Sequence, residues 1–224
     1  MITTQGKAYQ YRDGIAVKTS RPPVDNLSDD VMVIWTDKRT ISPEQRRKAW
    51  ALIGEIAAAA GYIGAIEKDD LNYTLKGEFL RQRIDSLQAD AIKAFSLSDV
   101  DMTTARMYID WLVEFCIVND IPTKVPLYEM AEDIEAYVYT CLIKKKCVIC
   151  GKLADLHHVD RVGMGGDRRH MNHIGMQCLP LCRAHHQEAH QHGDSALLEK
   201  YHLVTVPIDE RIVKTYKLGG KKHD

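Results

Sequence analysis

Hydrophobic residues in the first part of the chain alternate at strand spacing near the N-terminus and recur at helical spacing further on. The stretch YQYRDGIAVKT (9–19) alternates hydrophobic and polar residues on both sides of an Asp-Gly pair, which predicts a β-hairpin. After Pro22-Pro23 and a polar run, VMVIW (31–35) predicts a further strand. The chain is therefore expected to begin with short strands.

The segment 42–60 predicts the first helix, because its start carries three capping signals. Ser42 is the expected N-cap, Pro43 takes the first helical position and Gln45 completes a capping box. Hydrophobic residues then recur at helical spacing and are expected to form one buried stripe, made of Trp50, Ile53, Ile56, Ala57 and Ala60.

Three more helices are predicted before the cysteine-rich segment. The first covers residues 69–84 around Leu75, Phe79 and Leu80. The second covers residues 101–119, ends before Pro122, and carries the apolar residues Tyr108, Trp111, Leu112, Phe115 and Val118. The third, over residues 127–143, is expected to run without a break towards Cys147.

Length and composition indicate a folded protein with one or two domains. The chain has 224 residues, of which 45% are hydrophobic, and this is sufficient for buried cores. We find no signal peptide and no apolar run of about 20 residues, so we expect a soluble protein of the cytoplasm, or of the host cytoplasm if a phage encodes it, with no membrane partner. Cysteines at knuckle spacing fit a reducing compartment.

Histidine and cysteine are concentrated in one segment of the second half. All ten histidines follow residue 156, and four of the six cysteines lie in residues 147–192. This concentration predicts metal binding. Cys116 and Cys141 lie instead in apolar helical runs and are expected to be buried thiols, whereas His170, His192, His202 and His223 are expected at the surface.

Spacing separates two sets of metal ligands within this segment. Cys147-x2-Cys150 and Cys182-x2-His185 together make a Cys3His set, which is typical of structural zinc. The pair His157-His158 and the pair His186 and His190 remain. A separation of four puts the second pair on one face of a helix, so these histidines predict a second metal site, one that does chemistry.

The assignment of the adjacent histidines 185 and 186 can be checked within the sequence. If His185 were in the second site, the residue one turn later would be Ala189, which cannot bind metal. His186 has His190 one turn later, and this leaves His185 at the correct distance from Cys182 for zinc. Only one assignment therefore satisfies both sites.

Residues 147–192 resemble the HNH (ββα-metal) endonucleases, in the branch that carries a zinc knuckle. LHHVD holds the first histidine pair, and HHQEAH forms the helix. The resemblance implies phosphodiester hydrolysis of DNA, with His158 as the general base. It also implies three ligands for a catalytic divalent ion, Mg²⁺, Mn²⁺, Ni²⁺ or Zn²⁺, namely His157, His186 and His190.

One position departs from the family pattern. The central Asn, which orients the base, falls on Gln177 in this chain. Glutamine carries the same amide on a longer stem, so it remains our first candidate for that role. Asn172 and His173 are alternative orienting residues.

The four histidines outside the Cys3His set also help to decide between two interpretations of the Cys/His segment. The first reading is a metal-dependent endonuclease, in which a neutral histidine with a pKa of about 6.5 removes a proton from water. The alternative is a non-catalytic, zinc-containing DNA-binding module. A structural zinc does not need the HH and HxxxH histidines, so we favour the nuclease. A site-specific cutter of homing or restriction type is a third, weaker possibility.

Charge is divided unevenly along the chain. Residues 1–140 include 16 basic and 22 acidic residues, whereas residues 141–224 include 14 basic and 9 acidic residues. The metal ligands therefore lie in the basic part, which suits a phosphate partner. The best candidates for contact with DNA are in and near the glycine-rich GMGGDRR segment and the helix, namely Arg161, Arg168, Arg169 and Arg183.

The region 30–122 resembles the Orf (NinB) family of phage recombination mediator proteins. The resemblance is carried by DKRTISPEQRRKAWALIGEIA and FSLSDVDMTTARMYIDWLVEFCIVNDI. It implies a homodimer that binds single-stranded or branched DNA in phage recombination, with a single-strand-binding protein or recombinase as partner. Lys38 and Arg39 would contact DNA there, whereas Trp50 and Trp111 are expected in the core. We therefore expect an α+β chain with an Orf-like domain (1–140) and a nuclease domain (141–224).

Overall fold

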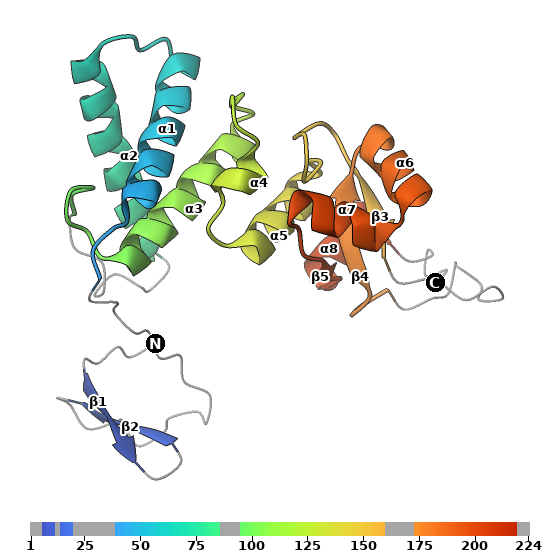
Figure 1. Ribbon diagram of the computed structural model, residues 1–224, viewed down its shortest axis with the longest axis horizontal. Helices are drawn as coiled ribbons and strands as arrows, with labels where there is room; N and C mark the ends of the chain where they lie inside the picture. The colour runs from blue at the N-terminus through green and yellow to red at the C-terminus, as the bar shows by residue number, and fades with distance from the viewer. Residues whose placement is uncertain (1–5, 12–13, 20–38, 86–94, 160–172, 219–224) are drawn as a thin grey trace, which may run out of the picture.

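The computed structural model describes residues 6–11, 14–19, 39–85, 95–159 and 173–218. Over these residues the protein is mixed α+β and mostly helical, with one two-stranded and one three-stranded antiparallel sheet (Figure 1). None of the helices in these ranges is long and apolar enough to cross a membrane.

The N-terminal hairpin is confirmed. Strand β1 (Gly6–Tyr11) pairs antiparallel with β2 (Gly14–Thr19), and Tyr11 is opposite Gly14. The turn residues 12–13 and the predicted strand 31–35 lie outside the described residues.

Helix α1 (Pro43–Ala59) begins with the predicted capping box. The Ser42 hydroxyl accepts a hydrogen bond from the backbone N–H of Gln45 at 3.0 Å. The Gln45 side-chain oxygen accepts one from the backbone N–H of Ser42 at 3.2 Å. These two bonds satisfy backbone donors that the first helical turn leaves without partners, and this explains why the helix starts at this point.

The predicted apolar stripe of α1 is wrong at its two ends. Ile53, Ile56 and Ala57 are buried, but Trp50 is 37% exposed and Ala60 is also exposed. The buried face instead follows Ala49, Leu52, Ile53 and Ile56, so Trp50 lies at the edge of that face. Trp111, in contrast, is buried as expected.

The next two helices occur where the sequence predicts them. Helix α2 (Ala65–Asp85) starts four residues earlier than expected, and α3 (Met102–Val118) is capped by Asp101, which accepts from Thr104 N at 2.9 Å. Phe79 of α2 meets Tyr108 of α3 edge to face, with ring centroids 5.3 Å apart. Val118, the last residue of α3, is 44% exposed.

The single helix predicted over residues 127–143 is wrong. The structure has α4 (Leu127–Met130) and α5 (Ile134–Lys144). Between them, a carboxylate oxygen of Asp110 on α3 accepts from the backbone N–H groups of Glu132 and Asp133 at 2.7 and 3.0 Å. Because these donors bond to a neighbouring helix, they cannot continue the α4 ladder.

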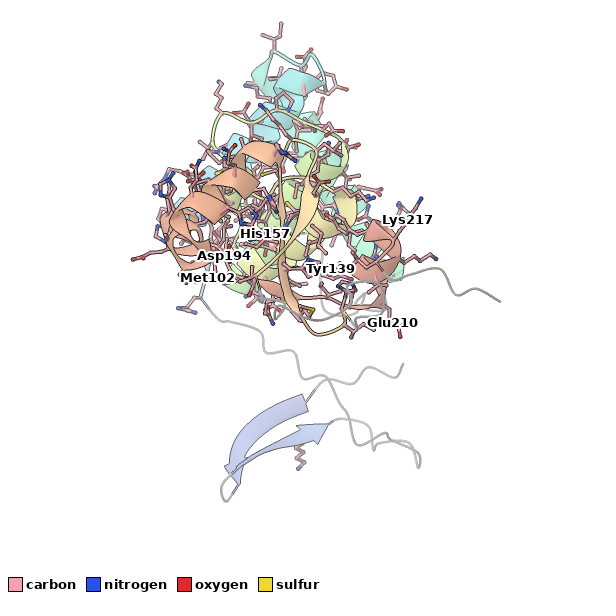
Figure 2. All side chains as sticks on the ribbon, turned by 90° about the vertical axis from the view of Figure 1, so that its right-hand side faces the viewer. Met102, Tyr139, His157, Asp194, Glu210 and Lys217 are labelled. Atoms are coloured by element: carbon pink, nitrogen blue, oxygen red, sulfur yellow. The ribbon has the colours of Figure 1, made fainter. Side chains whose placement is uncertain are left out.

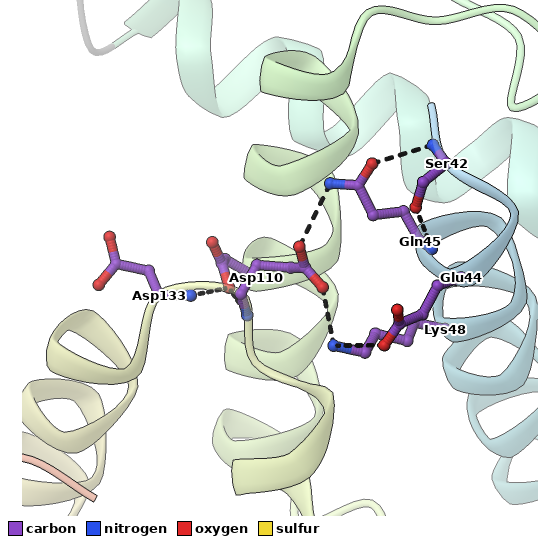
Figure 3. Close-up of polar contacts among 7 residues, drawn as sticks. Ser42, Glu44, Gln45, Lys48, Asp110 and Asp133 are labelled. Atoms are coloured by element: carbon purple, nitrogen blue, oxygen red, sulfur yellow. Dashed lines mark hydrogen bonds and ion pairs between the residues drawn. The ribbon is translucent and has the colours of Figure 1, made fainter. Parts of the chain in front are cut away.

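The break between α4 and α5 is also tied to α1 (Figure 3). Glu132 accepts hydrogen bonds from Gln45 Nε2 at 3.2 Å and from Lys48 Nζ at 2.8 Å. Asp133 then caps α5 by accepting from Ala136 N at 3.1 Å. Helices α1 and α3 therefore meet the break between α4 and α5 at one polar junction.

The second half contains a small sheet, covered by helices. Its antiparallel strands, in the order β3-β4-β5, are β3 (Asp155–His158), β4 (Gln177–Leu181) and β5 (Val206–Pro207). The helices are α6 (Arg183–His192), α7 (Asp194–Tyr201) and α8 (Glu210–Tyr216). Helix α5 contacts both α3 and β4, and its buried residues belong to the same hydrophobic cluster as those of both neighbours. The predicted division at residue 140 falls inside α5 and stays a prediction.

Candidate active site

The predicted zinc ligands Cys147, Cys150, Cys182 and His185 come together at one point, where their ligand atoms all lie within 4.8 Å of one another. His185 Nδ1 lies 3.3 Å from Cys147 Sγ and 3.3 Å from Cys182 Sγ. The Cys150 and Cys182 sulfurs are 3.6 Å apart. Two thiolates on one tetrahedral zinc are separated by about 3.8 Å, so this donor set fits zinc in both type and size.

A tight turn and the start of a helix bring these four ligands together. Cys147 follows the end of α5, and the chain turns back at Gly151, which has a φ of 69° and donates to Cys147 O at 2.8 Å. Glycine suits this left-handed conformation because it has no Cβ. Cys182 is the N-cap residue of α6, and His185 lies in the first turn of that helix.

The electrostatics of the thiols favour a bound cation. Burial raises the pKa of the Cys147 thiol to about 12. Burial also acts to raise the pKa of Cys182, but hydrogen bonds, first that from His185 N–H, hold it below its usual value. Closely packed buried thiolates repel one another, and a divalent ion removes that repulsion and keeps the sulfurs deprotonated.

The predicted catalytic ligands also converge. His157 lies on β3 and is only 4% exposed, while His186 and His190 lie one turn apart on α6. The His157 ring centroid is 4.7 Å from that of His186 and 5.5 Å from that of His190. The ligand atoms of the three imidazoles lie within 4.8 Å of one another.

The His186 imidazole is biased towards its neutral form. Burial lowers its pKa, and the adjacent His157 and His190 lower it further. A neutral imidazole has the lone pair that a metal ligand needs. The set of three imidazoles therefore fits a divalent ion that accepts nitrogen ligands.

Sequence reasoning missed one residue at this centre. Asp194, the first residue of α7, places Oδ1 at 2.7 Å from His157 Nε2. Figure 2 labels the two residues side by side. The contact joins positions 37 residues apart, and no motif spacing indicates it.

The expected base His158 lies next to His157 on β3 and is half-buried. Its Nε2 is 3.1 Å from Nδ1 of His173. Gln177 begins β4, where its side-chain oxygen accepts a hydrogen bond from the Thr205 hydroxyl at 2.8 Å. Asn172 lies outside the described residues. Of the predicted orienting residues, His173 thus makes a defined hydrogen-bond contact with His158.

The candidate DNA-contacting residues can be located only in part. Arg183 is exposed at the start of α6, and its charge contributes to lowering the pKa of His186, so it lies near the histidine cluster. Arg39 is exposed just before α1. Four predicted residues lie outside the described residues, namely Lys38, Arg161, Arg168 and Arg169.

The remaining expectations for single residues are confirmed where they can be checked. Cys116 and Cys141 are buried, and burial raises the pKa of each thiol to about 12. His192 and His202 are exposed, whereas His170 and His223 lie outside the described residues.

Comparison with known proteins gives one match. A family model described as "Putative HNHc nuclease" matches residues 21–219. No curated protein and no solved structure matches the chain. The matched range includes β3 and α6, which carry the clustered histidines, and the helices of the first half. The comparisons give no support to the Orf (NinB) resemblance of residues 30–122.

Proposed function

This chain belongs to the HNHc nuclease family, a family of metal-dependent endonucleases, and from that premise we propose that it hydrolyses DNA phosphodiester bonds at the histidine cluster. The observation that carries the proposal is the convergence of His157, His186 and His190, with His158 next to His157 on β3. A structural zinc site explains none of these four histidines.

We propose that His157, His186 and His190 hold one divalent ion. The bound ion supplies positive charge, which stabilises the charge that develops on the phosphate and on the departing oxygen. Three imidazole nitrogens suit Zn²⁺, Ni²⁺ or Mn²⁺ better than Mg²⁺, which prefers oxygen ligands. The Cys3His set would hold a separate zinc that does no chemistry, since its four protein ligands complete a tetrahedron.

His158 is the proposed general base. His158 directly follows the proposed ligand His157 on β3 and is half-buried. Its imidazole takes a proton from the attacking water, whose oxygen forms the new bond to phosphorus as the P–O3′ bond breaks. The leaving oxygen takes a proton from solvent, and the products carry 5′-phosphate and 3′-hydroxyl ends.

His173 is the proposed orienting residue for this base. If His158 Nε2–H donates to His173 Nδ1, the lone pair that accepts the proton of water is on His158 Nδ1. The 3.1 Å contact supports this role for His173. Gln177, which carries the amide of the family's central Asn, stays the alternative.

Arg183 is the proposed phosphate contact closest to the cluster. It is exposed, and it lies one helical turn before His186 on α6. A guanidinium at this position can bind a phosphate beside the one that is cut. The same role for Arg161, Arg168 and Arg169 rests on their charge in the sequence.

Delivery to single-stranded or branched DNA in phage recombination, as a homodimer, rests on the sequence resemblance of residues 30–122 alone. The exposed side chain of Arg39 is compatible with that role. Binding to single-stranded, branched and duplex oligonucleotides of equal length tests it, because a mediator would favour the first two.

A plasmid-nicking assay tests the proposed function itself. Supercoiled DNA is incubated with the zinc-containing protein and Mn²⁺, Mg²⁺, Ni²⁺ or additional Zn²⁺, or with a chelator. We expect nicking with at least one ion and none with chelator. Intact plasmid under all conditions would instead support the non-catalytic DNA-binding alternative.

A further inference from the structure

Asp194 contacts the most buried residue of the histidine cluster. Its Oδ1 lies 2.7 Å from His157 Nε2, and His157 is only 4% exposed. A carboxylate can only accept a hydrogen bond, so the proton of this pair lies on His157 Nε2. The Nδ1 atom of the same ring is then the atom with a lone pair to offer.

Asp194 reaches His157 because the chain bends sharply between α6 and α7. Gly193 has a φ of 88° and a ψ of 152°, a conformation that side chains disfavour. The bend ends α6 at His192 and starts α7 at Asp194. Leu197, which is 1% exposed, then anchors α7 in the core.

Asp194 is distinct from the ligand set. The ligand atoms that lie within 4.8 Å of one another come from the three histidines and do not include an Asp194 oxygen. The hydrogen bond to Asp194 uses His157 Nε2, which leaves Nδ1 of the same ring as the nitrogen that can bind an ion.

We propose that Asp194 is a positioning residue, which fixes the ring orientation and tautomer of His157 so that Nδ1 binds the ion. This proposal rests on the proposed function, because it needs the three histidines to share one ion. A carboxylate that accepts the second N–H of a metal-bound histidine makes the ring a better ligand and holds it in place. It also satisfies an N–H that would otherwise be buried without a partner.

Nickel affinity of the intact, zinc-containing chain gives the first test. Titration calorimetry with Ni²⁺ compares the parent with Asp194→Ala, Asp194→Asn and the control Glu199→Ala, which removes an exposed carboxylate from the same helix. We expect Asp194→Ala to weaken nickel binding about 10- to 100-fold. Asp194→Asn keeps an oxygen acceptor and should recover part of the loss, while Glu199→Ala should bind as the parent does.

The tautomer of His157 gives a second test that needs neither nickel nor cleavage. NMR of the zinc-containing protein with nitrogen-labelled histidine should show the His157 proton on Nε2 in the parent and a mixture of tautomers in Asp194→Ala. Thermal unfolding of the same samples shows whether the substitution also destabilises the start of α7, and so separates a change of tautomer from a loss of structure.

The outcomes distinguish failure of the positioning role of Asp194 from failure of the proposed metal site at the three histidines. If the parent binds nickel and Asp194→Ala binds it equally well with an unchanged His157 tautomer, Asp194 has no positioning role. If X-ray absorption shows that Asp194→Ala loses one oxygen ligand from nickel, Asp194 is a direct ligand and the proposal is overturned. If the parent itself does not bind nickel at the histidines, the proposed metal site fails, while the tautomer measurement still decides whether Asp194 orients His157.

Discussion

His185 and His186 are adjacent on α6, yet their imidazoles belong to different clusters. His185 Nδ1 lies 3.3 Å from the sulfurs of Cys147 and Cys182, whereas the His186 ring is 4.7 Å from that of His157. The same helical turn therefore connects the Cys3His set with the three-histidine set. A metal ion bound by the Cys3His set would therefore also fix the start of α6, the helix that carries two histidines of the three-histidine set.

This connection predicts that the zinc site supports the histidine site. Cys150 is exposed, so Cys150→Ala removes a ligand with little loss of packing. We expect the variant to lose its zinc, to unfold at lower temperature and to bind nickel at least about tenfold more weakly, because α6 loses its anchor. Zinc analysis, thermal unfolding and nickel titration measure these changes. Cys150→His, which can still bind zinc, serves as the control, and unchanged nickel affinity after zinc loss would show that the sites are independent.

Replacing the proposed base should abolish chemistry without disturbing metal binding. We expect His158→Ala to lower the nicking rate by about 100- to 10,000-fold, because no side chain then takes the proton from water. Zinc content and nickel affinity should match those of the parent. The exposed His192 of α6 provides the control, since His192→Ala should cut at the parent rate. Equal rates for His158→Ala and the parent would rule out His158 as the base.

The contact between His158 and His173 predicts which residue orients the base. We expect His173→Ala to lower kcat by about 100-fold with little change in KM, since a misplaced base slows the chemical step and not DNA binding. His173→Asn keeps a hydrogen-bonding side chain and should recover part of that rate.

The matched comparison for His173 is Gln177→Ala, which removes the hydrogen bond from Thr205. We expect this variant to lose less kcat than His173→Ala. A larger loss in Gln177→Ala would return the orienting role to the position of the family's asparagine.

Arg183 is expected to act on DNA binding and not on the chemical step. Arg183→Ala should weaken binding to all DNA sequences alike and should reduce the dependence of log K on log salt concentration by about one, which corresponds to one phosphate contact. Fluorescence anisotropy at several salt concentrations measures both. Arg81, which pairs with Glu78 on α2, offers a control arginine. An unchanged salt dependence in Arg183→Ala would contradict the proposed contact.

Local signals in the sequence gave correct predictions, because the residues that produce them lie close together in the chain. The capping box of Ser42 and Gln45 sets the start of α1, and the spacing of His186 and His190 puts both rings on one face of α6. Spacing also grouped correctly the side chains that lie together in the two clusters, while their roles as metal ligands stay a prediction.

Contacts between distant segments account for the errors. The break between α4 and α5 depends on Asp110, more than twenty residues earlier, which binds the backbone of Glu132 and Asp133. Asp194 was missed because it meets His157 only after the chain turns at Gly193. No local pattern in the sequence indicates either contact.

The central claim is that imidazoles from β3 and α6 share one cation while thiolates hold another. Anomalous X-ray diffraction from crystals soaked in Mn²⁺, recorded at the zinc and manganese edges, tests it most directly. We expect a zinc peak among Cys147, Cys150, Cys182 and His185, and a separate manganese peak within bonding distance of His157, His186 and His190. Manganese bound elsewhere, with these three rings turned apart, would contradict the account.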